Sequence, residues 1–228
     1  MTEATIRGDS TPSEEIRILG RLARRKRRPL DPAEAYRRWA ADYGREHNAF
    51  QELEAGALER LLPALDGRAV LDAGGGKGRV AALALARGAS RAVAADFSLA
   101  MLAGARAGHR VAADVGALPF LPETFDVVVC ALVLGHVADL DRALAALAAV
   151  LRPGGHLLIS DFHPFATLRG WQRTFTDGRG RTHAIEQHLH LFADYVGAFR
   201  RLGLALEELE EPCWGGSPVV FAMRARKP

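Results

Sequence analysis

The chain has 228 residues, of which 49% are hydrophobic and 25% are charged, and its net charge at neutral pH is +3. These values are ordinary for a soluble globular protein, and the length suffices for one well-buried α/β domain with a small appendage. The sequence has no apolar run long enough to span a membrane and no signal-peptide core, and its two cysteines lack metal-binding spacing. We therefore expect a cytoplasmic protein without a disulfide framework or a metal site.

The first 65 residues are predicted to form a helical segment ahead of the first strand. The segments 11–14 and 31–34 each combine an N-cap residue, a proline at the first helical position and an acid two residues later. They predict one helix that ends near Arg28 and a second that carries aromatic residues at helical spacing. A third helical pattern covers 50–62.

Strand-like and helical patterns alternate beyond residue 66. The apolar, strand-like runs are 68–72, 91–96, 109–114, 125–132 and 155–161, and helical stretches fall at 76–87, 98–107 and 139–151. This alternation predicts a parallel sheet with right-handed crossovers and helices on both faces. We therefore expect an α/β fold with a Rossmann-like, doubly wound sheet.

The last third of the chain departs from this rhythm. Residues 162–190 are rich in glycine and aromatic residues and are expected to form an insertion at the acceptor site. A helix is predicted near 191–202, and strands are predicted at 204–210 and 218–225. These two strands are close in sequence, so we expect an antiparallel pair at one sheet edge. The domain organisation is thus an N-terminal helical segment, 1–65, and a Rossmann-like domain, 66–228.

The most informative stretch is 70–78, Val-Leu-Asp-Ala-Gly-Gly-Gly-Lys-Gly. An apolar strand ends in a carboxylate, and a glycine turn then leads into a helix. Glycine lets the backbone come close to a ligand, and the helix start offers unpaired N–H groups with a partial positive charge. We therefore expect a ligand to contact backbone here, with Asp72 at its edge.

Aspartates end three successive predicted strands: Asp72, Asp96 and Asp114. In an open parallel sheet, ligands bind beyond the carboxyl ends of the strands. Asp96 ends the second strand, where a carboxylate suits the two hydroxyls of a ribose. The glycine pattern differs from the G-x-G-x-x-G that holds a pyrophosphate, and Asp72 would repel a diphosphate but attract a cation. A nicotinamide dinucleotide is therefore disfavoured.

Five segments together carry a family pattern: 70–78, 94–102, 113–120, 125–129 and 151–157. On these segments the chain resembles the class I S-adenosylmethionine-dependent methyltransferases, most of all the small-molecule branch related to ubiquinone and menaquinone methyltransferases. The resemblance spans about 68–161 and is weak beyond 162. It implies a Rossmann-like fold and S-adenosyl-L-methionine as the cofactor.

The resemblance also implies roles for individual residues. Asp72 would lie near the donor's ammonium, Asp96 would hold the ribose hydroxyls, and Asp114 would accept from the adenine amino group. Gly74 and Gly76 would line the methionine, and Val115 and Phe97 would lie beside the adenine. Ala131, at the end of the fourth strand, would pass beside the donor. Tyr36 and Tyr43 would close over it from the N-terminal helices.

Methyl transfer from a sulfonium mainly requires alignment and a dry site, with a base where the acceptor is a hydroxyl. His163, after the fifth strand, is the first candidate for the base, and His190 is the second catalytic candidate. His136, after the fourth strand, is a further candidate for the base, and His188 is a runner-up together with His190 at the start of the next helix. Aromatic residues between 165 and 195 would serve either as core or as an apolar acceptor pocket.

The expected function is therefore methyl transfer from S-adenosylmethionine to a small, hydrophobic or aromatic metabolite, on oxygen, nitrogen or carbon. One alternative is an RNA methyltransferase that uses the basic run 21–28, although no aromatic residues interleave with that run and nucleic acid is not the expected partner. The other alternative is a non-methylating, cofactor-binding protein. A monomer or a homodimer is expected.

Overall fold

The structure is a computed structural model, and it describes residues 28–44, 48–105 and 108–228. The helix expected over 11–28 and the basic run 21–28 lie, except for Arg28, outside these ranges.

A seven-stranded sheet in the order β3-β2-β1-β4-β5-β11-β8 forms the centre of the fold. The first five strands in this order run parallel, whereas β11 is antiparallel to both β5 and β8. Both the doubly wound sheet and the antiparallel pair at one edge are confirmed. The strands are β1 (Ala69–Ala73), β2 (Arg91–Asp96), β3 (His109–Ala112), β4 (Phe125–Ala131), β5 (Leu151–Phe162), β8 (Ala205–Glu210) and β11 (Val220–Arg226).

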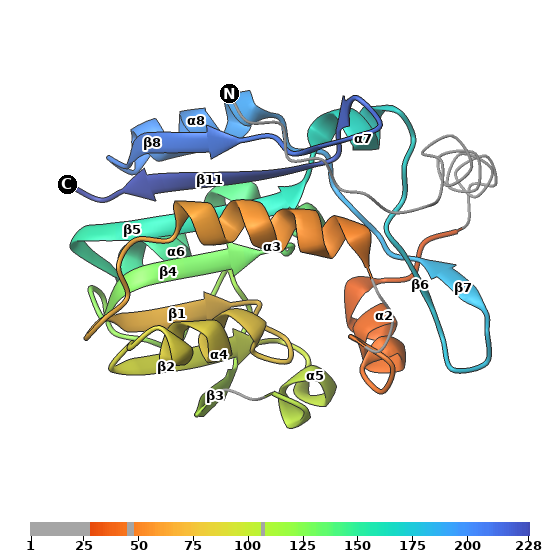
Figure 1. Cartoon of the computed structure of the whole chain (residues 1–228), viewed down its shortest axis with the longest axis horizontal. Helices are drawn as coiled ribbons and strands as arrows, with labels where there is room; N and C mark the ends of the chain where they lie inside the picture. The colour runs from red at the N-terminus through yellow and green to blue at the C-terminus, as the bar shows by residue number, and fades with distance from the viewer. Residues whose placement is uncertain (1–27, 45–47, 106–107) are drawn as a thin grey trace.

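Helices cover both faces of the sheet (Figure 1). Helices α3 (Ala49–Leu61) and α4 (Arg79–Ala86) pack on one face, and α6 (Leu140–Val150) and α8 (Phe192–Arg201) lie on the other. Successive residues of a strand point to opposite faces. Val70 and Leu71 of β1 accordingly belong to two different hydrophobic clusters. The near-continuous apolar strands are thus explained by burial on both faces.

Smaller elements gather beyond the carboxyl ends of the parallel strands, at the right of Figure 1. They are α2 (Pro32–Trp39), α7 (Pro164–Leu168) and the hairpin of β6 (Thr174–Thr176) and β7 (Thr182–Ala184). Leu30 N donates to Ala184 O at 2.8 Å, so the chain before α2 pairs with the insertion. The remaining elements are α5 (Leu99–Ala103), the 3-10 turn η1 (Leu134–His136), β9 (Cys213–Trp214) and β10 (Ser217–Pro218).

Local capping explains where several helices begin and end. Asp31 accepts from the backbone N–H of Ala33 at 2.8 Å and precedes a proline at the first position of α2, as its sequence predicts. Helix α5 is shorter than the expected 98–107. It ends at Ala103, where Gly104 N donates back to Met101 O.

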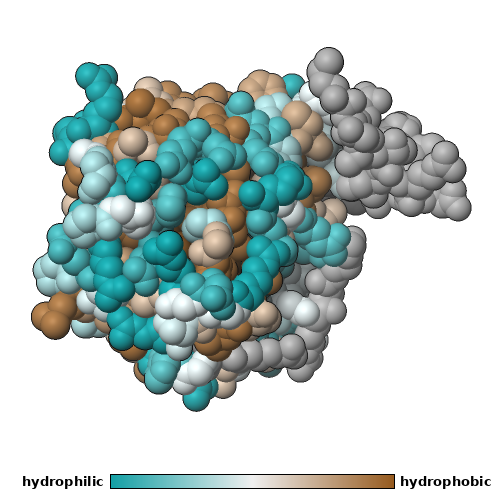
Figure 2. All heavy atoms as spheres, turned by 60° about the vertical axis from the view of Figure 1, so that its left-hand side comes forward, coloured by the Kyte–Doolittle hydropathy of each residue, from teal (hydrophilic) through white to brown (hydrophobic). Residues whose placement is uncertain are grey.

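Figure 2 shows one face of the molecule, on which hydrophilic residues alternate with patches of hydrophobic ones. Large hydrophobic residues that are partly exposed include Leu85, Leu206 and Leu209. Single leucines of this kind are common at protein surfaces and do not by themselves mark an interface. Within the residues that the structure describes, no helix is long and apolar enough to cross a membrane.

Gly155, in β5, offers a test of the sheet packing. A Cβ at this position would lie 2.8 Å from Asp126 O and 2.9 Å from Arg152 O, which are backbone atoms that cannot move cheaply. We expect Gly155→Ala to lower the free energy of unfolding by about 1–3 kcal/mol, measured by urea denaturation. Gly108→Ala is the matched control, because no heavy atom lies within 4 Å of its Cβ position. Equal effects of the two substitutions would contradict this packing.

Candidate active site

A cavity of about 1210 Å³ opens beyond the carboxyl ends of β1, β2 and β4. The glycine turn, the aspartates at the strand ends, helix α2 and the insertion all contribute to its wall. Every residue predicted to bind the cofactor lines it: Tyr43, Asp72, Gly74, Gly76, Asp96, Phe97, Asp114, Val115 and Ala131. Their contact with a donor stays a prediction, but the structure brings them to one cavity.

The glycine turn has the geometry of a backbone cradle. Gly74 and Gly76 have φ angles of +70° and +53°, in the region that favours glycine. A Cβ on Gly74 would lie 2.3 Å from a methyl of Val133, and one on Gly75 would lie 2.6 Å from the Asp72 carboxyl carbon. The turn is also anchored to the sheet, because Gly74 N donates to Ala95 O at 2.7 Å. These positions therefore require glycine, and a ligand can approach the main chain here.

Asp72 is a buried carboxylate at the edge of this cradle. Its Oδ2 accepts from the backbone N–H of Ala81 at 2.9 Å, in the first turn of α4. Burial raises the pKa of Asp72 to about 6, although this hydrogen bond and the Arg79 guanidinium oppose the rise. A cation bound next to this buried carboxylate would stabilise its ionised form.

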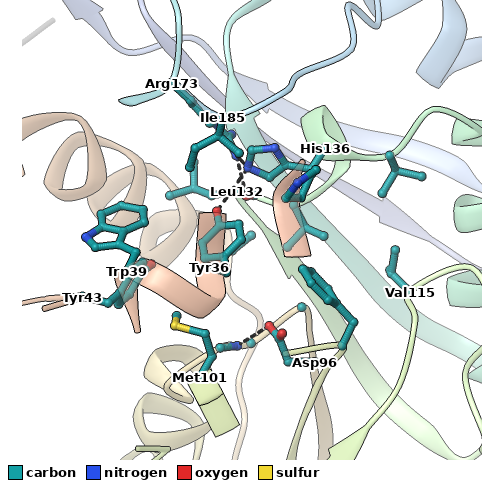
Figure 3. A pocket seen from close by; sticks show the side chains of 18 of the residues that line it. Tyr36, Trp39, Tyr43, Asp96, Met101, Val115, Leu132, His136, Arg173 and Ile185 are labelled. Atoms are coloured by element: carbon teal, nitrogen blue, oxygen red, sulfur yellow. Dashed lines mark hydrogen bonds between the residues drawn. The ribbon is translucent and has the colours of Figure 1, made fainter. Parts of the chain in front are cut away.

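Asp96 and Asp114 occupy the next two strand ends. Asp96 accepts from Gly76 N at 2.8 Å and from Ser98 N at 2.7 Å, and burial raises its pKa. Figure 3 shows the first of these bonds at the floor of the cavity. Asp114 accepts from Gly116 N at 2.7 Å. The Asp96 carboxylate thus ties the glycine turn to the end of β2, and each oxygen keeps a further lone pair for a ligand.

Aromatic side chains from α2 and the turn after it form one wall of the cavity (Figure 3). The rings of Tyr36 and Trp39 stack at 5.9 Å, and Trp39 stacks on Phe175 of the insertion at 5.1 Å. Tyr43 accepts a hydrogen bond from Gln51 at 2.9 Å. The N-terminal helices therefore reach the cavity as expected, and they do so in contact with the insertion.

A buried ion pair of Arg173 and Asp161 joins the insertion to the sheet. The side chain of Arg173 is 7% exposed and that of Asp161 is 3% exposed, and the two groups are hydrogen-bonded. Arg173 Nη1 also donates to Leu132 O at 2.8 Å, and Asp161 Oδ2 accepts from Gly135 N at 2.7 Å. Leu132 has a φ of +61°, which is unusual for a residue other than glycine. The pair thus holds the strained turn that follows β4.

His136 lies beside this pair and is locked on both ring nitrogens. Its Nδ1 lies 2.7 Å from the carbonyl oxygen of Glu186, and only a protonated nitrogen can donate there. Its Nε2 is therefore the acceptor for Arg173 Nη1 at 2.7 Å and for the Tyr36 hydroxyl at 3.1 Å. Burial and the Arg173 charge lower the pKa of His136 to about 3. This histidine is neutral and unsuited to accept a proton.

The two histidines predicted to be catalytic do not line the cavity. His163 caps α7, where its Nδ1 accepts from Phe165 N at 3.1 Å and its Nε2 lies 2.7 Å from Glu211 Oε1. His190 Nε2 donates to Val137 O at 2.8 Å. Both rings are taken up by structural contacts, so the geometry does not favour either of them as the base. The histidines that do line the cavity are His136 and His188.

A buried carboxylate paired with a more exposed arginine was missed from the sequence. Glu54 of α3 is fully buried, and its carboxylate bonds to the Ser160 hydroxyl and to Arg79 Nη2, the latter at 2.7 Å. Arg79 follows the glycine turn directly and lines the cavity. The signal was present, since Glu54 falls in the same helical stripe as Ala57, Leu58 and Leu61, where an acid needs a buried partner.

Arg173 was also missed, because its segment has no periodicity that would place it. As for metals, the described part of the chain contains no group of three or more histidine, cysteine, aspartate or glutamate side chains that could hold an ion.

Comparison with known proteins identifies a family that matches this chain. The sequence profile of a family described as a methyltransferase domain matches residues 71–159. The demethylmenaquinone methyltransferase of Thermobifida fusca is 33% identical over 172 residues, which cover 65% of this chain and 72% of that protein. The malonyl-[acyl-carrier protein] O-methyltransferase of Salmonella typhimurium is 40% identical over 127 residues, covering 54% of this chain and 50% of that protein.

A solved structure agrees with these relatives. The S-adenosylmethionine-dependent methyltransferase from Mesorhizobium loti superposes with a TM-score of 0.66 at 26% identity, covering 77% of this chain and 98% of the other. The relatives, the doubly wound sheet and the cradle of glycines and strand-end aspartates agree. The chain therefore belongs to the class I S-adenosylmethionine-dependent methyltransferases, and S-adenosyl-L-methionine is its methyl donor.

Proposed function

We propose that this enzyme methylates a small, hydrophobic or aromatic acceptor that binds between the donor and the insertion. The observation that carries the proposal is an aromatic lining from three separate elements: Phe50 of α3, Phe162 at the end of β5 and Trp171 of the insertion. The ring of Phe50 lies 6.0 Å from that of Phe162 and 5.9 Å from that of Trp171. Sites of this composition suit apolar ligands with a few polar groups.

The name of the first relative supports this class of acceptor, and the name of the second points to a different one. One relative is a methyltransferase of demethylmenaquinone, and the other is an O-methyltransferase of a malonyl group on a carrier protein. Because this chain spans 72% of the first protein and 50% of the second, their acceptors are not transferred to it.

At the donor end, we assign the roles that the family pattern implies. Asp96 would accept from both ribose hydroxyls, Asp72 would pair with the ammonium, and Asp114 would accept from the adenine amino group. Gly74 and Gly76 would lie along the methionine, and Val115, Phe97, Ala131 and Tyr43 would complete the contacts. The geometry of the site suits this donor. A Cβ on the glycines would fill the space next to the backbone, and the carboxylates line a cavity of about 1210 Å³.

The bound donor supplies a methyl carbon that its sulfonium already activates. The chain's residues then have to align the acceptor and exclude water. The aromatic wall of Tyr36, Trp39 and Tyr43 serves the second purpose, and it supports the interpretation of the N-terminal helical segment as a cap over the donor. In the described part of the chain, no observation favours the RNA alternative, and the basic run on which it depends lies elsewhere.

The donor site is tested by calorimetry with S-adenosylhomocysteine. We expect Asp96→Ala to weaken binding by roughly 10- to 100-fold, because hydrogen bonds to a charged group contribute about 1.5–3 kcal/mol each. Asp141→Ala is the matched control, since Asp141 of α6 is an exposed carboxylate that pairs with Arg201 of α8 and does not line the cavity. Circular dichroism checks that both variants fold. Undiminished binding by folded Asp96→Ala, or no binding by the parent protein, would refute the donor site.

The pH dependence of the same binding tests Asp72. Its pKa in the free protein is about 6, and only the ionised carboxylate can pair with the ligand's ammonium, which stays protonated between pH 5 and 7. The affinity of the parent should therefore rise about tenfold from pH 5 to pH 7, the range in which the ammonium stays protonated. In Asp72→Asn, which keeps an oxygen for Ala81 N, the affinity should be lower and this rise should shrink.

Asp96 also has a raised pKa and would contribute a pH dependence of its own. The comparison is therefore made between the parent and Asp72→Asn across the whole pH range. Two parallel curves would show that Asp72 does not pair with the ammonium.

A further inference from the structure

Among the described residues, two histidines line the cavity, and their surroundings differ. His136 has both ring nitrogens engaged and a neutral ring, as described above. His188 is half-buried, and within the described part of the chain neither of its ring nitrogens has a hydrogen-bond partner. Its ring only stacks loosely on that of His190, at 6.5 Å between centroids. His188 is thus the cavity histidine with nitrogens available to a ligand.

The backbone fixes the position of His188. Its N–H donates to Gly135 O at 2.7 Å, so it is attached to the turn that follows β4, beside the predicted position of the donor. Its neighbour Gln187 contacts the insertion instead, donating to Trp171 O at 3.0 Å and accepting from Arg173 N at 3.2 Å. Glu186 and His188 thus line the cavity, whereas Gln187 between them bonds to other residues of the insertion.

The carboxylates of the cavity offer little competition as bases. Asp72, Asp96 and Asp114 would be occupied by the donor under the proposed contacts, and Asp31 and Asp139 are the N-cap residues of α2 and α6, whose carboxylates accept from backbone N–H groups. Glu186 is the cavity carboxylate for which the described residues provide no side-chain partner, and it is two residues from His188. Imidazole is the side chain that most often takes a proton near neutral pH. Glu186 is therefore the rival to be tested beside His188.

We propose that His188 is the general base of the reaction and that the acceptor is a phenol, methylated on its hydroxyl oxygen. This inference rests on the proposed function. The phenol would enter the cavity with its hydroxyl toward His188 and its ring against aromatic residues of the cavity lining. As the oxygen forms its bond to the methyl carbon, the carbon–sulfur bond breaks and its electron pair goes to sulfur. The hydroxyl proton passes to a ring nitrogen of His188, so the products are an aryl methyl ether, S-adenosylhomocysteine and an imidazolium.

A pair of phenols of different acidity separates a base from a merely structural residue. 4-Methylphenol, like the tyrosine side chain, has a pKa of about 10 and must lose its proton in the reaction. 4-Nitrophenol is largely ionised in mildly alkaline buffer and needs no base. We expect His188→Gln to lower kcat for 4-methylphenol by about 10²- to 10⁴-fold with little change in KM. For 4-nitrophenol, kcat of the same variant should fall by less than about tenfold, because this acceptor is already ionised and does not need the base.

Two further variants complete the experiment. Glu186→Gln tests the rival base, and His109→Gln makes the same chemical change as His188→Gln at an exposed position on β3. His109→Gln should retain the parent's rates with both phenols. If Glu186→Gln and not His188→Gln is rescued by 4-nitrophenol, the assignment to His188 is overturned. It is equally overturned if His188→Gln loses the same factor with both phenols, because that pattern indicates a positioning role.

The parent protein distinguishes this inference from the proposed function. If it binds S-adenosylhomocysteine but methylates neither phenol, the phenol acceptor is refuted and the donor site stands. If it binds no S-adenosylhomocysteine, the proposed function fails as well. Ether formation is followed by mass spectrometry, and the affinity of His188→Gln for S-adenosylhomocysteine should equal that of the parent.

Discussion

The buried pair of Arg173 and Asp161 is the interaction on which the architecture of the cavity depends. Two charges removed from water are costly unless every remaining donor and acceptor is satisfied. Both groups have further partners here, because Asp161 also accepts from Gly135 N and Arg173 also donates to Leu132 O. Loss of one partner would leave the other charge buried and uncompensated, at a cost of about 3–5 kcal/mol. A segment without regular periodicity is in this way fixed to the ends of β4 and β5.

Several features of the cavity follow from this pair. Arg173 faces His136 and keeps its imidazole neutral, and His136 in turn accepts from the hydroxyl of Tyr36. Helix α2 is therefore connected through two side chains to the same guanidinium that holds the turn after β4. The positive φ of Leu132 is tolerated because its carbonyl is held by Arg173 and its N–H donates to Ser160 O. The donor side and the acceptor side of the cavity consequently form one connected structure.

Most of the fold could be predicted because its signals are local. Hydrophobic periodicity, proline and glycine placed the strands and the helices to within a few residues, and β2 agrees with the expected 91–96 at both ends. The strand-end aspartates followed from the strands. The histidines could not be sorted in this way. His163 is engaged by Glu211, which lies 48 residues away, and His136 by Arg173, 37 residues away. Such pairs depend on how the insertion folds back, and its sequence carries no period from which that could be derived.

The charges around the donor end have a common logic. Burial raises the pKa values of Glu54, Asp72 and Asp96, because removal from water disfavours the ionised form of each carboxyl group. Arg79 offsets part of this cost, directly at Glu54 and through its field at Asp72. A further cation in the cavity would offset the rest. A sulfonium carries a positive charge that the thioether product lacks. Under the proposed donor contacts, Asp72 and Asp96 would therefore attract the methyl donor more strongly than the product left after transfer, and the same two acids would favour exchange of the spent cofactor.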